Sequence, residues 1–119
     1  MAVTTTTLSA HIGGKIIVDA DADSTVEQAL TSGTTIYQIR IDNSNNSNSV
    51  FLKIEDAQSG SNQNVPDHMF YCPSQSKVSY VINSGIVLAS GLAFYVTTSR
   101  AAANTDSPTK DVEVRLLVS

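Results

Sequence analysis

A regular alternation of apolar and polar residues over 34–42, resumed over 49–56, constrains this chain more than any other feature. Alternation with a period of two is what a strand with one buried and one wetted face requires. The residues between the two stretches, 43–48, are all Asn or Ser, which bond to nearby backbone and form turns. The pattern predicts two antiparallel strands joined by a polar loop, with an inward face made of Tyr37, Ile39 and Ile41.

Other short stretches are also apolar or alternating. They cover residues 16–18, 68–72, 77–82, 86–88, 92–98 and 111–118. Turn-forming residues separate them, and Asn83-Ser84-Gly85 is predicted to be a turn. Many short strands separated in this way are typical of antiparallel sandwiches. The sequence therefore predicts an all-β protein, an antiparallel β-sandwich of jelly-roll or immunoglobulin-like type with seven or eight short strands.

One segment, residues 24–30, has a helical signature. Ser24 and Glu27 have the spacing of a capping box, which predicts a helix of at most two turns, with a strand as the alternative. We therefore expect at most one short helix in the fold. The inward positions of the clearest strands predict a core that contains Val50, Leu52, Phe94, Val96, Val112 and Val114.

Length and composition set the domain count and exclude some partners. At 119 residues the chain is expected to form one domain, which we assign to residues 12–119, preceded by a Thr-rich N-terminal arm at residues 1–11. The net charge is −4 and the seven basic residues are scattered, which argues against binding nucleic acid. No apolar run approaches the ~20 residues of a membrane span. The N-terminus lacks the pattern of a secretory signal, so we expect synthesis in a cytoplasm.

Three carboxylates at alternate positions, Asp19, Asp21 and Asp23, suggest a calcium loop of the EF-hand type. That loop also needs Gly at its sixth and Glu at its twelfth position, where this chain has Ser24 and Leu30. A solvated acidic turn is the preferred interpretation. If a strand continued through these residues, the three carboxylates would line one face and could bind a divalent cation weakly.

The other reactive residue types do not form a recognisable motif. Cys72 is single, which excludes an intramolecular disulfide and a Cys-based zinc site, and we expect it to pack as a small hydrophobe. His11 and His68 have no metal-ligand spacing, and no nucleophile-elbow motif is present. A sugar-stacking platform would need exposed tyrosines, but structural roles are preferred for all four: Tyr37, Tyr71, Tyr80 and Tyr95.

Taken in order, several features resemble a family of small β-sandwich structural proteins of tailed bacteriophages. The resemblance covers residues 34–118. Its features are Tyr37, Ile41-Asp42-Asn43, Asn46, Val50, Leu52-Lys53, Val65-Pro66-Asp67, Gly85, Gly91-Leu92, Thr97-Thr98, Ser107-Pro108 and the strand with Val112 and Val114. Members of that family are known as virion proteins, so the resemblance implies a role in a phage particle.

The expected function is that of a non-enzymatic virion protein, made in the host cytoplasm. We expect a capsid decoration or cement protein that bridges subunits of the major capsid protein and forms a homo-oligomer, either a dimer or a trimer. Neither a cofactor, a metal ion, a nucleic acid, a membrane nor any catalytic residue is expected to take part. Two alternatives stay open: a tail, neck or fibre-associated virion protein, and a host-surface or carbohydrate-binding β-sandwich module.

Overall fold

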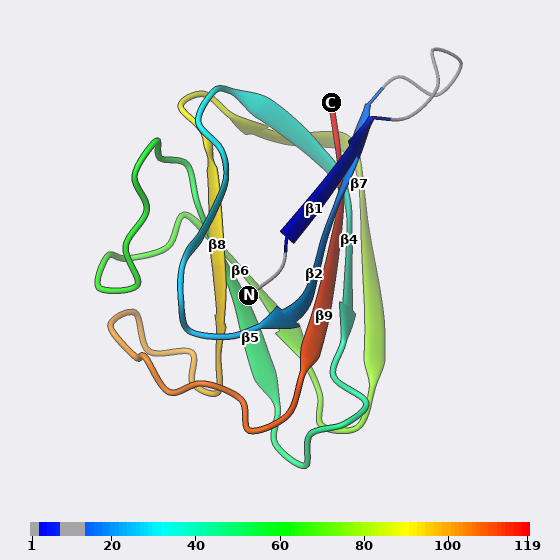
Figure 1. Ribbon diagram of the computed structural model, residues 1–119, viewed down its shortest axis with the longest axis vertical. Helices are drawn as coiled ribbons and strands as arrows, with labels where there is room; N and C mark the ends of the chain where they lie inside the picture. Colours follow the sequence, from blue (N-terminus) through cyan, green and yellow to red (C-terminus); the bar gives the residue numbers. More distant parts are fainter. Residues whose placement is uncertain (1–2, 8–13) are drawn as a thin grey trace.

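The computed structural model describes residues 3–7 and 14–119, and these residues form strands and loops without a helix. The chain folds into two sheets that pack face to face (Figure 1). The strands are β1 (Val3–Thr7), β2 (Lys15–Ala22), β3 (Glu27–Leu30), β4 (Thr34–Asp42), β5 (Val50–Glu55), β6 (His68–Cys72), β7 (Lys77–Leu88), β8 (Leu92–Thr97) and β9 (Val112–Val118).

One sheet has five strands in the order β1-β2-β9-β4-β7, and the other has four in the order β3-β8-β5-β6. Every pair of neighbouring strands is antiparallel. The predicted all-β antiparallel sandwich is confirmed, and the described residues form nine strands rather than seven or eight. Residues 3–7, which the sequence assigns to an arm, form the edge strand β1 against β2.

The core lies between the two sheets and follows the alternation of the strands. In β9, for example, Val112, Val114 and Leu116 point inward and are fully buried, while Arg115 points outward and is exposed. All of the predicted core residues have 0% exposed surface: Val50, Leu52, Phe94, Val96, Val112 and Val114. Each such side chain contributes roughly 1.5–3 kcal/mol by leaving water, so this interior supplies most of the driving force for folding.

The assignment of Tyr37 to the core is wrong, because β4 contains a bulge at this residue. Ile36 pairs with Val118 and Gln38 with Leu117, so β4 has one residue more than β9 in this interval. Beyond a bulge, the positions whose side chains point into the core shift by one residue. Ile36 and Ile39 are therefore both fully buried, whereas Tyr37 is 40% exposed.

The predicted turn at residues 83–85 is also wrong, because β7 runs without a break from Lys77 to Leu88. These residues belong to an irregular part of β7 that faces the bulge of β4. Gly85 has a φ of 79°, and a Cβ atom there would lie 2.3 Å from Cγ2 of Thr35. Glycine is required by this geometry, which is why a turn-like sequence occurs inside a strand.

The predicted hairpin of residues 34–56 does not form, because β4 and β5 belong to different sheets. Both edges of β4 are already occupied, by β7 and β9. The loop between β4 and β5 crosses from one sheet to the other, and two of its side chains, Asn43 and Asn46, are buried. Nδ2 of Asn43 donates to the carbonyl of Asn48 at 2.9 Å, and the amide of Lys110 donates to Oδ1 of Asn46 at 2.9 Å.

The short helix predicted for residues 24–30 is wrong as well, and the alternative of a strand is confirmed over residues 27–30. Residues 27–30 form β3, which pairs with the edge of β8. Oδ1 of Asp23 accepts a hydrogen bond from the amide of Thr25 at 2.9 Å and so shapes the turn before the strand. Pairing with a buried neighbouring strand satisfies the backbone of this segment and overrides a short local helix signal.

Candidate functional site: the open face of the five-stranded sheet

The outer side of the four-stranded sheet is covered by the protein's own loops. The loops after β5 and after β8 lie on that side of the sandwich, at the left of Figure 1. Lys53 and Tyr95 point outward from this sheet, yet they are 0% and 1% exposed. The loop after β5 approaches so closely that a Cβ atom on Gly60 would lie 2.5 Å from the Cβ atom of Ala93. The loops therefore cover β8 and β5, while Met69 and Tyr71 stay exposed on the edge strand β6.

Under these loops, Lys53 and Glu55 are hydrogen-bonded by the protein itself, whereas the Tyr95 hydroxyl has no hydrogen-bond partner among the described residues. Nζ of Lys53 donates to the carbonyl oxygen of Ala101 at 2.6 Å and lies 5.8 Å from the centre of the Tyr95 ring. Glu55 accepts a hydrogen bond from the amide of Ser61 at 3.1 Å. Burial lowers the pKa of Lys53 and raises the pKa of Tyr95. These contacts attach the loops to the sheet, and the enclosed groups are not accessible to a large ligand.

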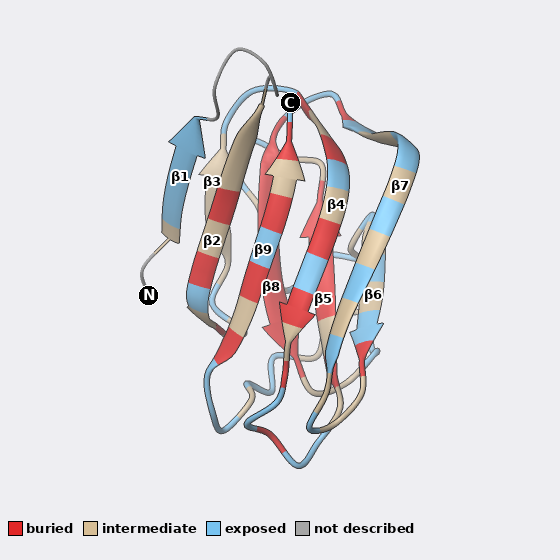
Figure 2. Cartoon of the chain, turned by 90° about the vertical axis from the view of Figure 1, so that its right-hand side faces the viewer, coloured by how far each residue is buried: buried red, intermediate tan, exposed pale blue. Residues whose placement is uncertain are grey.

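The outer side of the five-stranded sheet is uncovered over the described residues, and Figure 2 looks directly onto it. We call this surface the open face. Its exposed apolar side chains include Val81 and Val87 of the edge strand β7, which are 70% and 71% exposed. The outward-pointing residues that define the open face are Ile16, Val18, Gln38, Arg40, Asp42, Lys77, Ser79, Val81, Val87, Glu113, Arg115 and Leu117.

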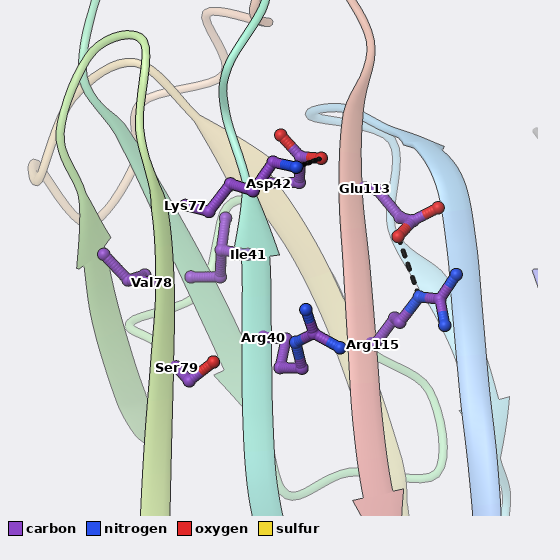
Figure 3. Close-up of a pocket in the computed structure, with 8 residues that line it drawn as sticks. All are labelled: Arg40, Ile41, Asp42, Lys77, Val78, Ser79, Glu113 and Arg115. Atoms are coloured by element: carbon purple, nitrogen blue, oxygen red, sulfur yellow. Dashed lines mark hydrogen bonds and ion pairs between the residues drawn. The ribbon is translucent and has the colours of Figure 1, made fainter.

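Charged residues surround a shallow hollow of about 310 Å³ in the lower part of the open face (Figure 3). Nε of Arg115 donates to Oε1 of Glu113 at 2.8 Å, and Nζ of Lys77 lies 3.7 Å from Oδ2 of Asp42. The hydroxyl and amide of Ser44 donate to Asp42 at 2.6 Å and 3.0 Å, and these bonds, with Lys77, hold its pKa below the usual range.

Arg40 occupies the middle of this hollow. It is the direct cross-strand partner of Arg115, so two guanidinium-bearing residues of like charge face each other on neighbouring strands. Figure 3 shows the Arg40 side chain extending toward Arg115. The alternation of 34–42 indicates that Arg40 points outward, but the register that brings it opposite Arg115 could not be derived from the sequence.

The three aspartates do not form the predicted solvated turn. Asp19 lies on β2 and is fully buried, with its side chain on the same inward face as Ile17. Its Oδ1 accepts a hydrogen bond from the amide of Asp21 at 3.2 Å, and its Oδ2 has no hydrogen-bond partner among the described residues. Burial, followed by the nearby carboxylates of Asp21 and Glu27, raises the pKa of Asp19 to about 7.

The metal-ligating and aromatic candidates are dispersed. No group of three His, Cys, Asp or Glu side chains suited to a metal ion occurs within residues 3–7 and 14–119. Cys72 is buried at the end of β6, as expected for a small hydrophobe, and burial raises the pKa of its thiol. His68 is half-buried on β6. His11 lies outside the described residues.

The four tyrosines do not share a surface. Tyr95 is buried, and Tyr80 is half-buried with its ring 5.1 Å from that of Phe70. The two exposed tyrosines belong to different sheets, because Tyr37 projects from β4 and Tyr71 from β6. A single flat platform of stacked rings is therefore not present in the described part of the chain.

Comparisons with known proteins gave no match to a family model, to a curated protein or to a solved structure. Among the described residues, no helix has the length and apolar character needed to cross a membrane. Function is therefore inferred from the sequence features and from the geometry of the open face.

Proposed function

We propose that this chain is a non-enzymatic structural protein that binds other protein subunits through its open face. The observation that carries the proposal is the difference between the two outer surfaces of the sandwich. Loops bury Lys53, Glu55 and Tyr95 over β5 and β8 of the four-stranded sheet, which exposes Met69 and Tyr71 at its edge strand β6. The described loops leave the five-stranded sheet uncovered across its width, and Val81 and Val87 stand exposed on it. An uncovered sheet with exposed apolar side chains next to paired charges has the composition of a protein-binding surface.

The molecule is large enough for a contact of standard size on this side. It measures 39 × 26 × 25 Å along its principal axes, so a rectangle around the side seen in Figure 2 covers roughly 1,000 Å², the same order as the ~800 Å² per partner of a standard protein interface. The sheet behind the open face has a fully packed interior, so little conformational entropy is lost when a partner binds.

The setting we propose is a phage particle, with the protein acting as a capsid decoration or cement protein. The resemblance of residues 34–118 to phage β-sandwich structural proteins supports this setting. Copies bound at equivalent junctions of the major capsid protein would oppose the separation of neighbouring subunits. Assembly of the protein into a dimer or trimer would add avidity, because each further contact forms at high effective concentration.

Removal of the protein from the particle tests this proposal. Heads should still assemble, because a decoration protein binds the completed shell, but they should lose DNA at a lower temperature or after osmotic shock. Added purified protein should restore resistance, and adsorption to the host should be unchanged. A defect in adsorption with normal head stability would contradict the proposal and favour a host-surface module.

Variants of the purified protein connect this test to the open face. Val81→Asp places a charge among the apolar residues of the open face and should abolish restoration of head stability. Val65→Asp is the matched control, since Val65 is 77% exposed in the loop before β6 and lies outside the open face. Quantitative mass spectrometry of particles adds a second criterion. Hundreds of copies agree with decoration, and a few dozen or fewer would instead indicate the neck, tail or fibre.

A further inference from the structure

The two arginines of the open face place like charges on neighbouring strands. Arg40 and Arg115 are direct partners in the β4–β9 register, which places their Cβ atoms about 5 Å apart. Like charges directly opposite each other in a sheet repel and destabilise it. An anion from outside the chain would neutralise such a pair.

The pairing of the charges around the hollow leaves Arg40 without an acidic partner. Glu113 binds Arg115, Asp42 binds Lys77, and no carboxylate within the described residues contacts Arg40. The hollow is lined by three cationic and two anionic side chains, so it has one net positive charge. The chain as a whole has a net charge of −4, so this positive site is a local exception.

We propose that Arg40 and Arg115 together bind one carboxylate, supplied by an Asp or Glu side chain of the partner protein that docks on the open face. A planar guanidinium presents paired N–H donors that match the two oxygens of a carboxylate. A carboxylate between Arg40 and Arg115 would cancel the excess charge and convert the repulsion into two attractive contacts. The charge of the site matches a monoanion. Nucleic acid would bring several negative charges close to Asp42 and Glu113.

The surroundings of the arginine pair fit the centre of an interface. A second, smaller hollow of about 160 Å³ adjoins the pair on the side toward Ile16 and Leu117, so both arginines border apolar surface as well as charge. Arginine beside apolar residues at the centre of a contact is the usual composition of a binding hot spot. This inference rests on the proposed protein-binding function, because it names the chemistry that the partner contributes.

Titration of the isolated protein tests the site without requiring a particle. The probe is N-acetyl-glutamate α-amide, which carries one carboxylate, and the readout is the NMR signals of the arginine Nε–H groups at constant ionic strength. We expect saturable shifts of the Arg40 and Arg115 signals. Arg40→Gln should weaken binding at least tenfold, whereas Arg100→Gln, at an exposed arginine in the loop after β8, should leave it unchanged. If the probe shifts the Arg115 signal equally in wild type, Arg40→Gln and Arg100→Gln, the proposal is overturned.

Two further measurements complete the test. Inorganic phosphate in the same titration distinguishes the anion class, and tighter binding of phosphate than of the carboxylate probe would overturn the assignment to an acidic side chain. The thermal midpoint of Arg40→Gln should rise slightly in the absence of ligand, because the repulsion is removed. A lower midpoint would mean that Arg40 stabilises the free protein and would contradict the argument. Because these results come from the free protein, a failure of particle binding would refute the virion setting and leave the carboxylate site standing.

Discussion

Substitution of Asp19 by Asn should make the protein more stable at neutral and alkaline pH. Asp19 is fully buried and its Oδ2 has no hydrogen-bond partner among the described residues, so the ionised carboxylate is poorly solvated. Its pKa is raised by burial from 3.8 to about 7. The folded protein therefore holds a proton on Asp19 over a pH range in which the unfolded chain has released it.

The sign of the effect follows from this difference in bound protons. Between pH 3.8 and about 7, unfolding releases the Asp19 proton, so the free energy of unfolding falls as the pH rises through this window. At ~1.4 kcal/mol per pH unit, the loss amounts to roughly 4 kcal/mol once the pH is above 7. The pKa of Glu27 is also raised by burial, and its titration adds to the same trend.

Chemical denaturation of wild type and Asp19→Asn between pH 4.5 and 8.5 measures this contribution. Asn keeps the oxygen that accepts from the Asp21 amide but does not titrate, so the variant should be more stable than wild type at pH 8 by up to ~4 kcal/mol. The two proteins should be close in stability near pH 4.5. Asp111→Asn, at an exposed position, should follow the wild-type curve. Two results would refute the conclusion that burial raises the pKa of Asp19. One is a free energy of unfolding of wild type that rises from pH 5 to 8, and the other is the same dependence on pH in Asp19→Asn as in wild type.

Further predictions concern the core, the crossing loop, the β7 irregularity and the N-terminal strand. Leu52→Ala should lower the free energy of unfolding by about 2–5 kcal/mol in urea titrations, because it leaves a cavity between the sheets. Asn46→Ala should cost about 1–3 kcal/mol by the same measurement, since the buried Oδ1 of Asn43 would lose its donor, Nδ2 of Asn46. Gly85→Ala should lower the thermal midpoint, because its φ of 79° and the close side chain of Thr35 exclude a Cβ atom. Deletion of residues 1–11 removes an edge strand with exposed threonines, so thermal stability should change little while oligomerisation, measured by light scattering, weakens.

Local sequence pattern predicted the all-β antiparallel class and the listed core residues of this protein correctly. The alternation of residues such as Leu52 and Val114 identifies inward positions without knowledge of the partner strand, because side chains of a strand alternate between its two sides. The short segments and their turn residues were also sufficient to predict an antiparallel sandwich. The same alternation placed Arg40 on an outward face, where the structure has it.

What the pattern could not decide depended on contacts between residues far apart in the chain. Tyr37 left the core because β4 accommodates a bulge between two neighbouring strands, and the loop with Asn43 crosses between sheets because β7 and β9 occupy both edges of β4. Lys53 is buried only because a distant loop, with Ala101, folds over it.

The candidate site shows the same division. The sequence determined that Arg40 and Arg115 lie on strands that alternate between core and solvent, since that property is local. Only the tertiary structure decided that they face each other on an uncovered sheet. Strand order and register are set by the combined burial and hydrogen bonding of all the strands, and no single segment contains that information.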